Sequence, residues 1–92
     1  MNKLLGYTCA ELNCYLDDLK GSKRSDISRK RKIATLVLRL SGMNWNEIAT
    51  LLNKDRSTLQ EAEKKADFHD KALAEAIYLN FWNWVNMKAR KL

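Results

Sequence analysis

The sequence predicts an all-α fold, a compact bundle of about five helices, and three observations carry this prediction. The 92-residue chain has no proline and only three glycines, so little in it interrupts helices. Its apolar residues recur at helical spacing, and no stretch shows the alternation of a half-buried strand. A chain of this length can form one hydrophobic core. We therefore expect a single helical domain over residues 1–92.

The first helix is expected over about 8–20. Thr8 can cap it, Glu11 follows at the capping-box position, and Gly21 can end it. Its apolar stripe consists of Leu12, Tyr15, Leu16 and Leu19.

The second helix is expected over about 28–41, after a polar and basic linker at 21–28. Gly42 would stop this helix. Its apolar residues at helical spacing are Ile33, Leu36, Val37 and Leu40.

Two shorter helices, near 45–52 and 56–66, are expected to form a helix-turn-helix. Asn44 can cap the first of them, with Glu47 at the capping-box position. Ala49 is the small residue that a close crossing of two helices needs, and Asn53 tolerates the left-handed conformation of a tight turn. Asp55 is a natural cap for the second helix, and the small core of the unit consists of Ile48, Leu52 and Leu59.

The last helix, about 70–89, is apolar on two sides. One side carries Leu73, Ile77, Phe81, Trp84 and Val85, and the other carries Tyr78, Leu79 and Trp82. A terminal helix of this kind is either buried within its own chain or shared with a partner. We expect a homodimer through Tyr78, Leu79 and Trp82, with intrachain burial as the alternative.

The positive charge is concentrated in one segment. Residues 20–32 hold seven Lys or Arg and one acid, a net charge of +6, which equals the net charge of the whole chain. A neutral body with one basic segment favours contact with a polyanion, the alternative being a solvated loop. The residues expected to grip phosphates or a minor groove are Arg29, Lys30, Arg31 and Lys32.

The exposed side of the 56–66 helix offers side chains suited to reading base edges. Arginine can bond guanine, glutamine adenine, glutamate the cytosine amino group, and hydroxyls either bases or phosphates. The candidate base-reading and DNA-contacting residues of this unit are Asp55, Arg56, Ser57, Thr58, Gln60, Glu61 and Lys64. The alternative is that they are polar surface positions of a helical bundle.

Residues 29–66 resemble the C-terminal DNA-binding domain of the bacterial replication initiator DnaA. The matching residues are Arg29, Arg31, Ile33 and Ala34, then Leu40-Ser41-Gly42, Glu47-Ile48 and Lys54-Asp55-Arg56-Ser57-Thr58-Leu59. The resemblance implies a Trp-repressor-like helix-turn-helix. In it the basic segment would reach the minor groove and phosphates, and residues 55–58 would read the major groove. The turn here is one residue shorter, and Arg56 replaces a histidine of that family's pattern.

Other classes of function find little support. Cys9 and Cys14, five apart in the first expected helix, should point to different faces and stay as buried, reduced thiols. No residue pattern indicates a catalytic site, a metal site or a cofactor, and Trp45 is expected to pack against the preceding segment. No stretch is long and apolar enough to span a membrane, so we expect a cytoplasmic protein.

The sequence thus predicts a sequence-specific double-stranded DNA binder of a bacterial or phage kind, most simply a small transcriptional regulator acting as a dimer. The alternative is a protein-interaction module on the same scaffold, such as a replication or transcription adaptor or a phage-type inhibitor of a host protein.

Overall fold

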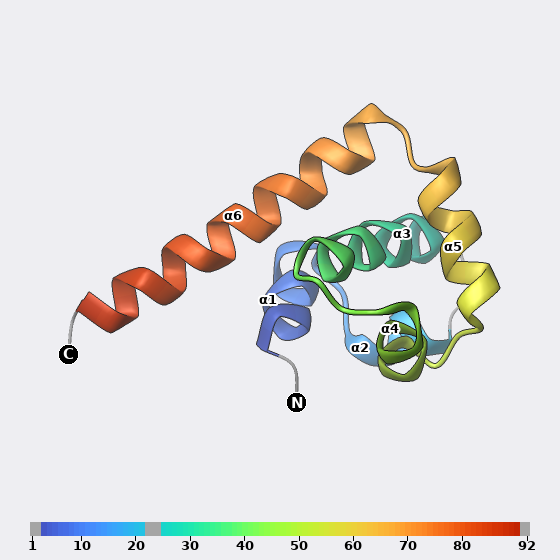
Figure 1. Cartoon of the computed structure of the whole chain (residues 1–92), viewed down its shortest axis with the longest axis horizontal. Coiled ribbons are helices and arrows are strands. Elements are labelled where there is room, and N and C mark those ends of the chain that lie inside the picture. Colours follow the sequence, from blue (N-terminus) through green and yellow to red (C-terminus); the bar gives the residue numbers. More distant parts are fainter. Residues whose placement is uncertain (1–2, 22–24, 91–92) are drawn as a thin grey trace.

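The computed structural model describes residues 3–21 and 25–90, and within these ranges the chain forms six α-helices and no strand (Figure 1). The all-α prediction is confirmed. No helix in the described ranges has the length and apolar character needed to cross a membrane. The helices are α1 (Lys3–Glu11), α2 (Leu16–Gly21), α3 (Ser25–Leu40), α4 (Trp45–Leu52), α5 (Arg56–Lys65) and α6 (Phe68–Arg90).

The central helix is α3, which contacts each of the other five helices. Its buried residues face several directions, because neighbours surround it, and a helix apolar on several sides belongs in a core. They are Ile27, Ile33, Ala34, Leu36, Val37 and Leu38. Thr35 is also buried, and its hydroxyl donates to the carbonyl of Arg31 at 2.8 Å, so the polar group is satisfied.

The expectation of one helix over 8–20 is wrong, because the chain bends at residues 12–15 between α1 and α2. Asn13 adopts a left-handed conformation (φ 55°), and the Cys14 N–H donates to the Cys9 carbonyl at 3.0 Å, which closes the end of α1. Thr8 is not a cap: it is buried inside α1, and its hydroxyl donates to the Leu4 carbonyl at 2.7 Å. Tyr15 leaves the expected apolar stripe and is 81% exposed.

The other boundaries agree more closely with the sequence. The structure confirms α4 at 45–52, and α5 ends at Lys65, one residue before the expected end. Helix α3 begins at Ser25, three residues earlier than expected, so the last part of the expected 21–28 linker is helical. Residues 22–24 of that linker lie outside the described residues. Gly42 follows α3 with φ 92°, as a residue that stops a helix should.

Helix α6 packs on α3 and α1 along one stripe, and its C-terminal part extends beyond α1 (Figure 1). The buried residues of this stripe are Asp70, Ala74, Ile77 and Phe81. The Phe81 ring meets the Tyr7 ring edge to face, with centroids 5.5 Å apart. Leu73 was expected on the buried side but is exposed, because Ala74 occupies the contact with α3.

Candidate nucleic-acid interface

Helices α4 and α5 form a compact pair joined by the three-residue connection 53–55. Ile48, Leu52 and Leu59 are fully buried, as the sequence predicted, and they attach both helices to the core. Ala49 is half-buried against that core. Because α5 is held through Leu59, its opposite side faces outward.

Hydrogen bonds to the backbone fix the start of α4 and the turn that follows it. The Asn44 side chain accepts from the Glu47 N–H at 2.9 Å, which confirms Asn44 as the cap of α4. Asn53 is left-handed (φ 51°), as expected, and the Lys54 N–H donates to the Ala49 carbonyl at 3.1 Å. These bonds end α4 and fix the direction in which α5 starts.

Asp55 has the position and extended backbone of a cap for α5, but its side chain makes no capping hydrogen bond. The expected capping role of its carboxylate is therefore wrong. The exposed carboxylate keeps its acceptor capacity for a ligand. Asp55 also lines a shallow surface hollow of about 450 Å³, together with Asn53, Lys54 and Thr58.

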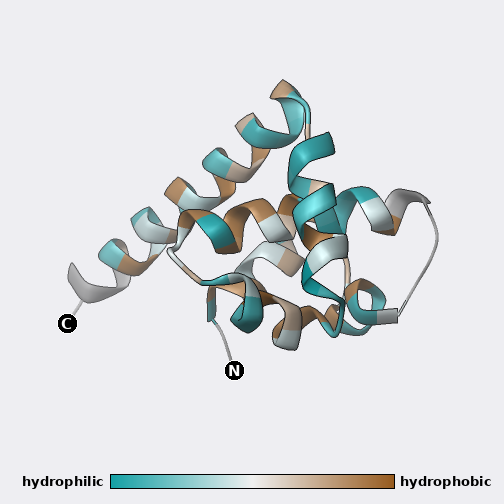
Figure 2. Ribbon diagram, turned by 45° about the vertical axis from the view of Figure 1, so that its right-hand side comes forward, coloured by the Kyte–Doolittle hydropathy of each residue, from teal (hydrophilic) through white to brown (hydrophobic). Residues whose placement is uncertain are grey.

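The outward side of α5 is polar and exposed (Figure 2). Gln60 is half-buried. Within the described ranges, the structure records no hydrogen bond or ion pair for these side chains. The exposed residues from the predicted set are Asp55, Arg56, Ser57, Thr58, Glu61 and Lys64.

Arg39, which the sequence analysis did not single out, ties three helices together. Its Nε lies 3.8 Å from Glu63 Oε2 on α5, and its Nη1 donates to the Met43 carbonyl at 2.8 Å. The guanidinium also lies over the Trp45 ring, 4.7 Å from the centroid. This contact confirms that Trp45 packs within the protein. Arg39 and Leu59 together hold α5 at two points along its length.

The predicted basic residues on α3 make contacts inside the protein. Lys30 Nζ donates to the Asn13 carbonyl at 3.4 Å, and Arg31 Nε donates to the Leu19 carbonyl at 2.6 Å. Arg29 and Lys32 both bind Asp70 of α6, at 3.2 and 3.4 Å. These four residues therefore connect α3 to the bend at 12–15, to α2 and to α6.

Asp70 organises the start of α6, and the sequence analysis missed it. Its N–H donates to Asp67 Oδ1 at 2.8 Å, while the Asp67 N–H donates to Asp70 Oδ2 at 3.4 Å, a reciprocal capping arrangement. Burial alone would raise the pKa of Asp70. The hydrogen bonds from Arg29 and Asp67 and the charge of Lys32 outweigh that effect, and the pKa is lowered. The Asp-x-x-Asp spacing at 67–70 was the available signal.

Comparison with known families, curated proteins and solved structures finds no match.

The internal contacts of the basic segment do not cancel its charge. Carbonyl acceptors are neutral, and in the part of the chain whose side chains are described the ion pairs of Arg29 and Lys32 share one carboxylate, that of Asp70. The Arg29 side chain remains 62% exposed. Helix α3 contacts α5, and the printed ion pair between them joins Arg39, in the C-terminal half of α3, to Glu63. The cations at 29–32 lie on the N-terminal half of α3, next to the start of α6. Lys23 and Arg24 of the basic segment lie outside the described residues.

The two thiols are neighbours, contrary to the expectation that they point to different faces, because the bend at 12–15 brings Cys14 back toward Cys9. Both are free thiols. Burial raises the pKa of Cys9 to about 11, and burial also raises the pKa of Cys14, while Cys9 and Lys30 act to lower it. The described residues contain no cluster of three or more His, Cys, Asp or Glu placed to hold a metal ion.

Proposed function

We propose that this protein binds double-stranded DNA sequence-specifically, with α5 as the recognition helix and α4 as its support, in the manner of a small transcriptional regulator. The observation that carries the proposal is the exposed, unpaired polar side of α5, held outward by Leu59 and Arg39. In a helix-turn-helix, the N-terminal residues of the second helix meet base edges in the major groove.

The first turns of α5 hold complementary groups for base reading. Arg56 can donate two hydrogen bonds to guanine, Gln60 can pair with adenine, and Glu61 can accept from the cytosine amino group. Ser57 and Thr58 can bond bases or phosphates. Ser57, Glu61 and Lys64 lie on the side of α5 opposite Leu59, and Arg56, Gln60 and Thr58 flank them.

Phosphate contacts would come from two places on the molecule. Lys54 lines the hollow at the turn between α4 and α5, which Thr58 also lines. The α3 cations add the second positive region, mainly through the exposed Arg29. Because α3 cations are already bonded within the protein, we assign them to general attraction and α5 to sequence reading. Log affinity should then fall with log salt, at about −0.9 for each phosphate contacted.

Fluorescence anisotropy with labelled duplexes, taken first from a random pool and then from the selected sequences, tests the proposal. The double variant Arg56→Ala/Gln60→Ala should lose at least about tenfold in affinity for the selected duplex, because one lost bidentate contact is worth about 1–3 kcal/mol. The matched control is Lys71→Ala/Asn80→Ala, which removes a cation and an amide from exposed positions on α6 and should bind as wild type. No retention of any duplex at low salt would rule the proposal out.

A second candidate function is the protein-interaction module, in which the same side of α5 binds another protein. Two observations favour it: the α3 cations are engaged internally, and Glu61 places an acid on the exposed side of α5. Under this alternative, wild-type protein would retain no duplex. The expected homodimer, which would suit a palindromic DNA site, gains support from the exposure of Leu79 and Trp82 on α6.

A further inference from the structure

The outer side of α6 carries a regular row of exposed residues, of which Trp82 is partly covered by its ring contacts with Tyr78 and Phe81. The row follows the alternating spacing of four and three residues that two packed helices share. It lies nearly opposite the buried stripe of Ala74, Ile77 and Phe81. We call it the α6 outer row: Phe68, Ala72, Glu75, Leu79, Trp82 and Asn86.

We propose that the central part of the α6 outer row, Glu75, Leu79, Trp82 and Asn86, pairs with the same four residues of a second copy of this chain, with the two helices antiparallel and a two-fold axis between residues 80 and 81. Leu79 is 61% exposed and Trp82 is 44% exposed, although both are large and apolar. Tyr78 is half-buried at the edge of this row, where its ring contacts Trp82 at 6.1 Å between centroids. It therefore supports Trp82 from the side.

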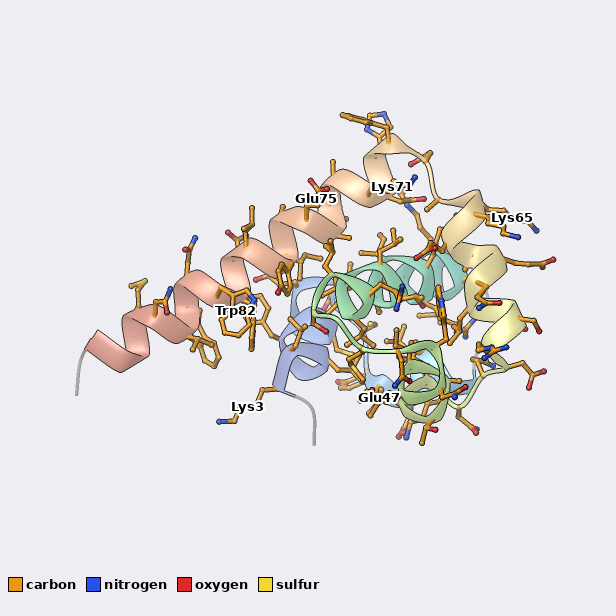
Figure 3. The ribbon with its side chains drawn as sticks, in the orientation of Figure 1. Lys3, Glu47, Lys65, Lys71, Glu75 and Trp82 are labelled. Carbon is orange, nitrogen blue, oxygen red and sulfur yellow. The ribbon has the colours of Figure 1, made fainter. Side chains whose placement is uncertain are left out.

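The chemistry of the row is self-complementary in this one arrangement. About an axis between 80 and 81, Leu79 of one copy faces Trp82 of the other, so apolar groups meet. Glu75 faces Asn86, whose amide can donate to the carboxylate in a charge-assisted hydrogen bond. Figure 3 labels Glu75 and Trp82 along this helix. Both contacts occur twice, once on each side of the axis, as two-fold symmetry requires.

Other arrangements are less favourable. In a parallel pair, each residue would face its own copy, and Glu75 would face Glu75, which places like charges in a contact. In an antiparallel pair shifted by one heptad, Glu75 would face Leu79 and lose a hydrogen-bonding partner. The C-terminal part of α6 extends beyond α1, so its residues are not covered there by the helices of the bundle (Figure 1).

Sedimentation equilibrium of the full chain over a range of concentrations tests the dimer. Wild type should reach twice the monomer mass of 10.7 kDa, whereas Leu79→Glu should shift the dissociation constant by at least about a hundredfold toward monomer. Leu73→Glu is the matched control, because Leu73 is an exposed leucine on α6 outside the row, and it should dimerise as wild type. A monomeric wild type, or equal weakening by both variants, would overturn the proposal.

A swap of the polar pair tests the antiparallel direction. Asn86→Glu alone should weaken the dimer, because it places a second carboxylate against Glu75 of the partner copy. Adding Glu75→Asn should restore dimerisation, since a carboxylate again faces an amide. Glu75→Asn alone separates the two directions, because in a parallel pair it would strengthen the dimer by removing the Glu75–Glu75 contact. In the antiparallel pair it removes the carboxylate that Asn86 bonds, so a stronger dimer would contradict the antiparallel arrangement. Circular dichroism on each variant separates dimer loss from unfolding. Duplex binding by a monomer would leave the proposed DNA function intact.

Discussion

The outward side of α5 and the first half of α3 both carry polar and basic side chains, but the fold uses them in different ways. On α3, Arg29 and Lys32 bind Asp70, while Lys30 and Arg31 bind backbone carbonyls of the α1–α2 region. On α5, Arg56, Ser57 and Glu61 are exposed and make no recorded bond to another described residue. Charge density alone would point to α3 as the binding surface. The contacts show that α3 holds the fold, and they leave α5 available for a ligand.

The largest expected effect comes from removing the residue that holds α5 in place. Leu59→Ala should lower the free energy of unfolding by about 2–5 kcal/mol, because Leu59 is fully buried and the change leaves a cavity. Urea unfolding followed by circular dichroism measures this. Leu73→Ala, at an exposed position on α6 outside the α6 outer row, should change stability by less than about 0.5 kcal/mol. Equal effects at the two positions would mean that α5 is not anchored through Leu59.

A smaller effect should follow from removing the acceptor of the α3 cations. Asp70→Asn should cost about 1–3 kcal/mol at neutral pH, because charge-assisted hydrogen bonds to Arg29 and Lys32 are lost. Since folding lowers the pKa of Asp70 below its ordinary 3.8, its stabilisation is present above that value and disappears as the pH falls through the folded value. The stability gap between wild type and Asp70→Asn should therefore close below about pH 4.

Chemical unfolding at a series of pH values measures this difference in the free energy of unfolding between wild type and Asp70→Asn. Asp17→Asn serves as the control, because Asp17 is exposed on α2 and should give a curve parallel to wild type. A gap that stays constant into acid would show that the Asp70 charge does not hold α3 to α6.

These contacts also show where sequence reasoning works and where it stops. The bounds of α4, the cap at Asn44 and the left-handed Asn53 follow from local rules of spacing and backbone conformation, so they were predictable. The pairs Arg29–Asp70 and Lys32–Asp70 join residues 41 and 38 positions apart, and only the tertiary packing of α6 on α3 brings them together. The bend at 12–15 was missed because no glycine or proline interrupts the apolar spacing there. The polar side of α5 was placed correctly, but its freedom from internal bonds required the structure.

The turn between α4 and α5 allows a finer test. Asn53→Ala should lower the free energy of unfolding by about 1–2 kcal/mol, because the left-handed conformation is unfavourable for most residues with a Cβ. Asparagine tolerates this conformation better than alanine does. Asn53→Gly should be nearly neutral, since glycine adopts φ near 51° without a steric cost. Thermal melting should show a fall of about 4–8 °C for each kcal/mol lost. Equal melting temperatures for the two variants would contradict a strained turn.

The smallest effect concerns thiol reactivity beside α3. Iodoacetamide should alkylate Cys14 before Cys9, because burial raises the pKa of Cys9 to about 11 and leaves little thiolate at neutral pH. Both rates should rise about tenfold per pH unit below each pKa. Lys30→Gln should slow the alkylation of Cys14, because the charge of Lys30 helps to lower the pKa of that thiol. Intact-mass spectrometry gives the rates, and Lys71→Gln on α6 is the control. Faster reaction of Cys14 in Lys30→Gln would contradict the internal role of Lys30.

The most direct test of the central claim is an NMR titration of the full chain with a duplex selected from a random pool. Amide shift changes should concentrate at residues 54–64, with weaker, salt-sensitive changes at 29–32. Changes centred on the α6 outer row, or on 29–32 with none in α5, would contradict the assignment of α5 as the surface that reads DNA.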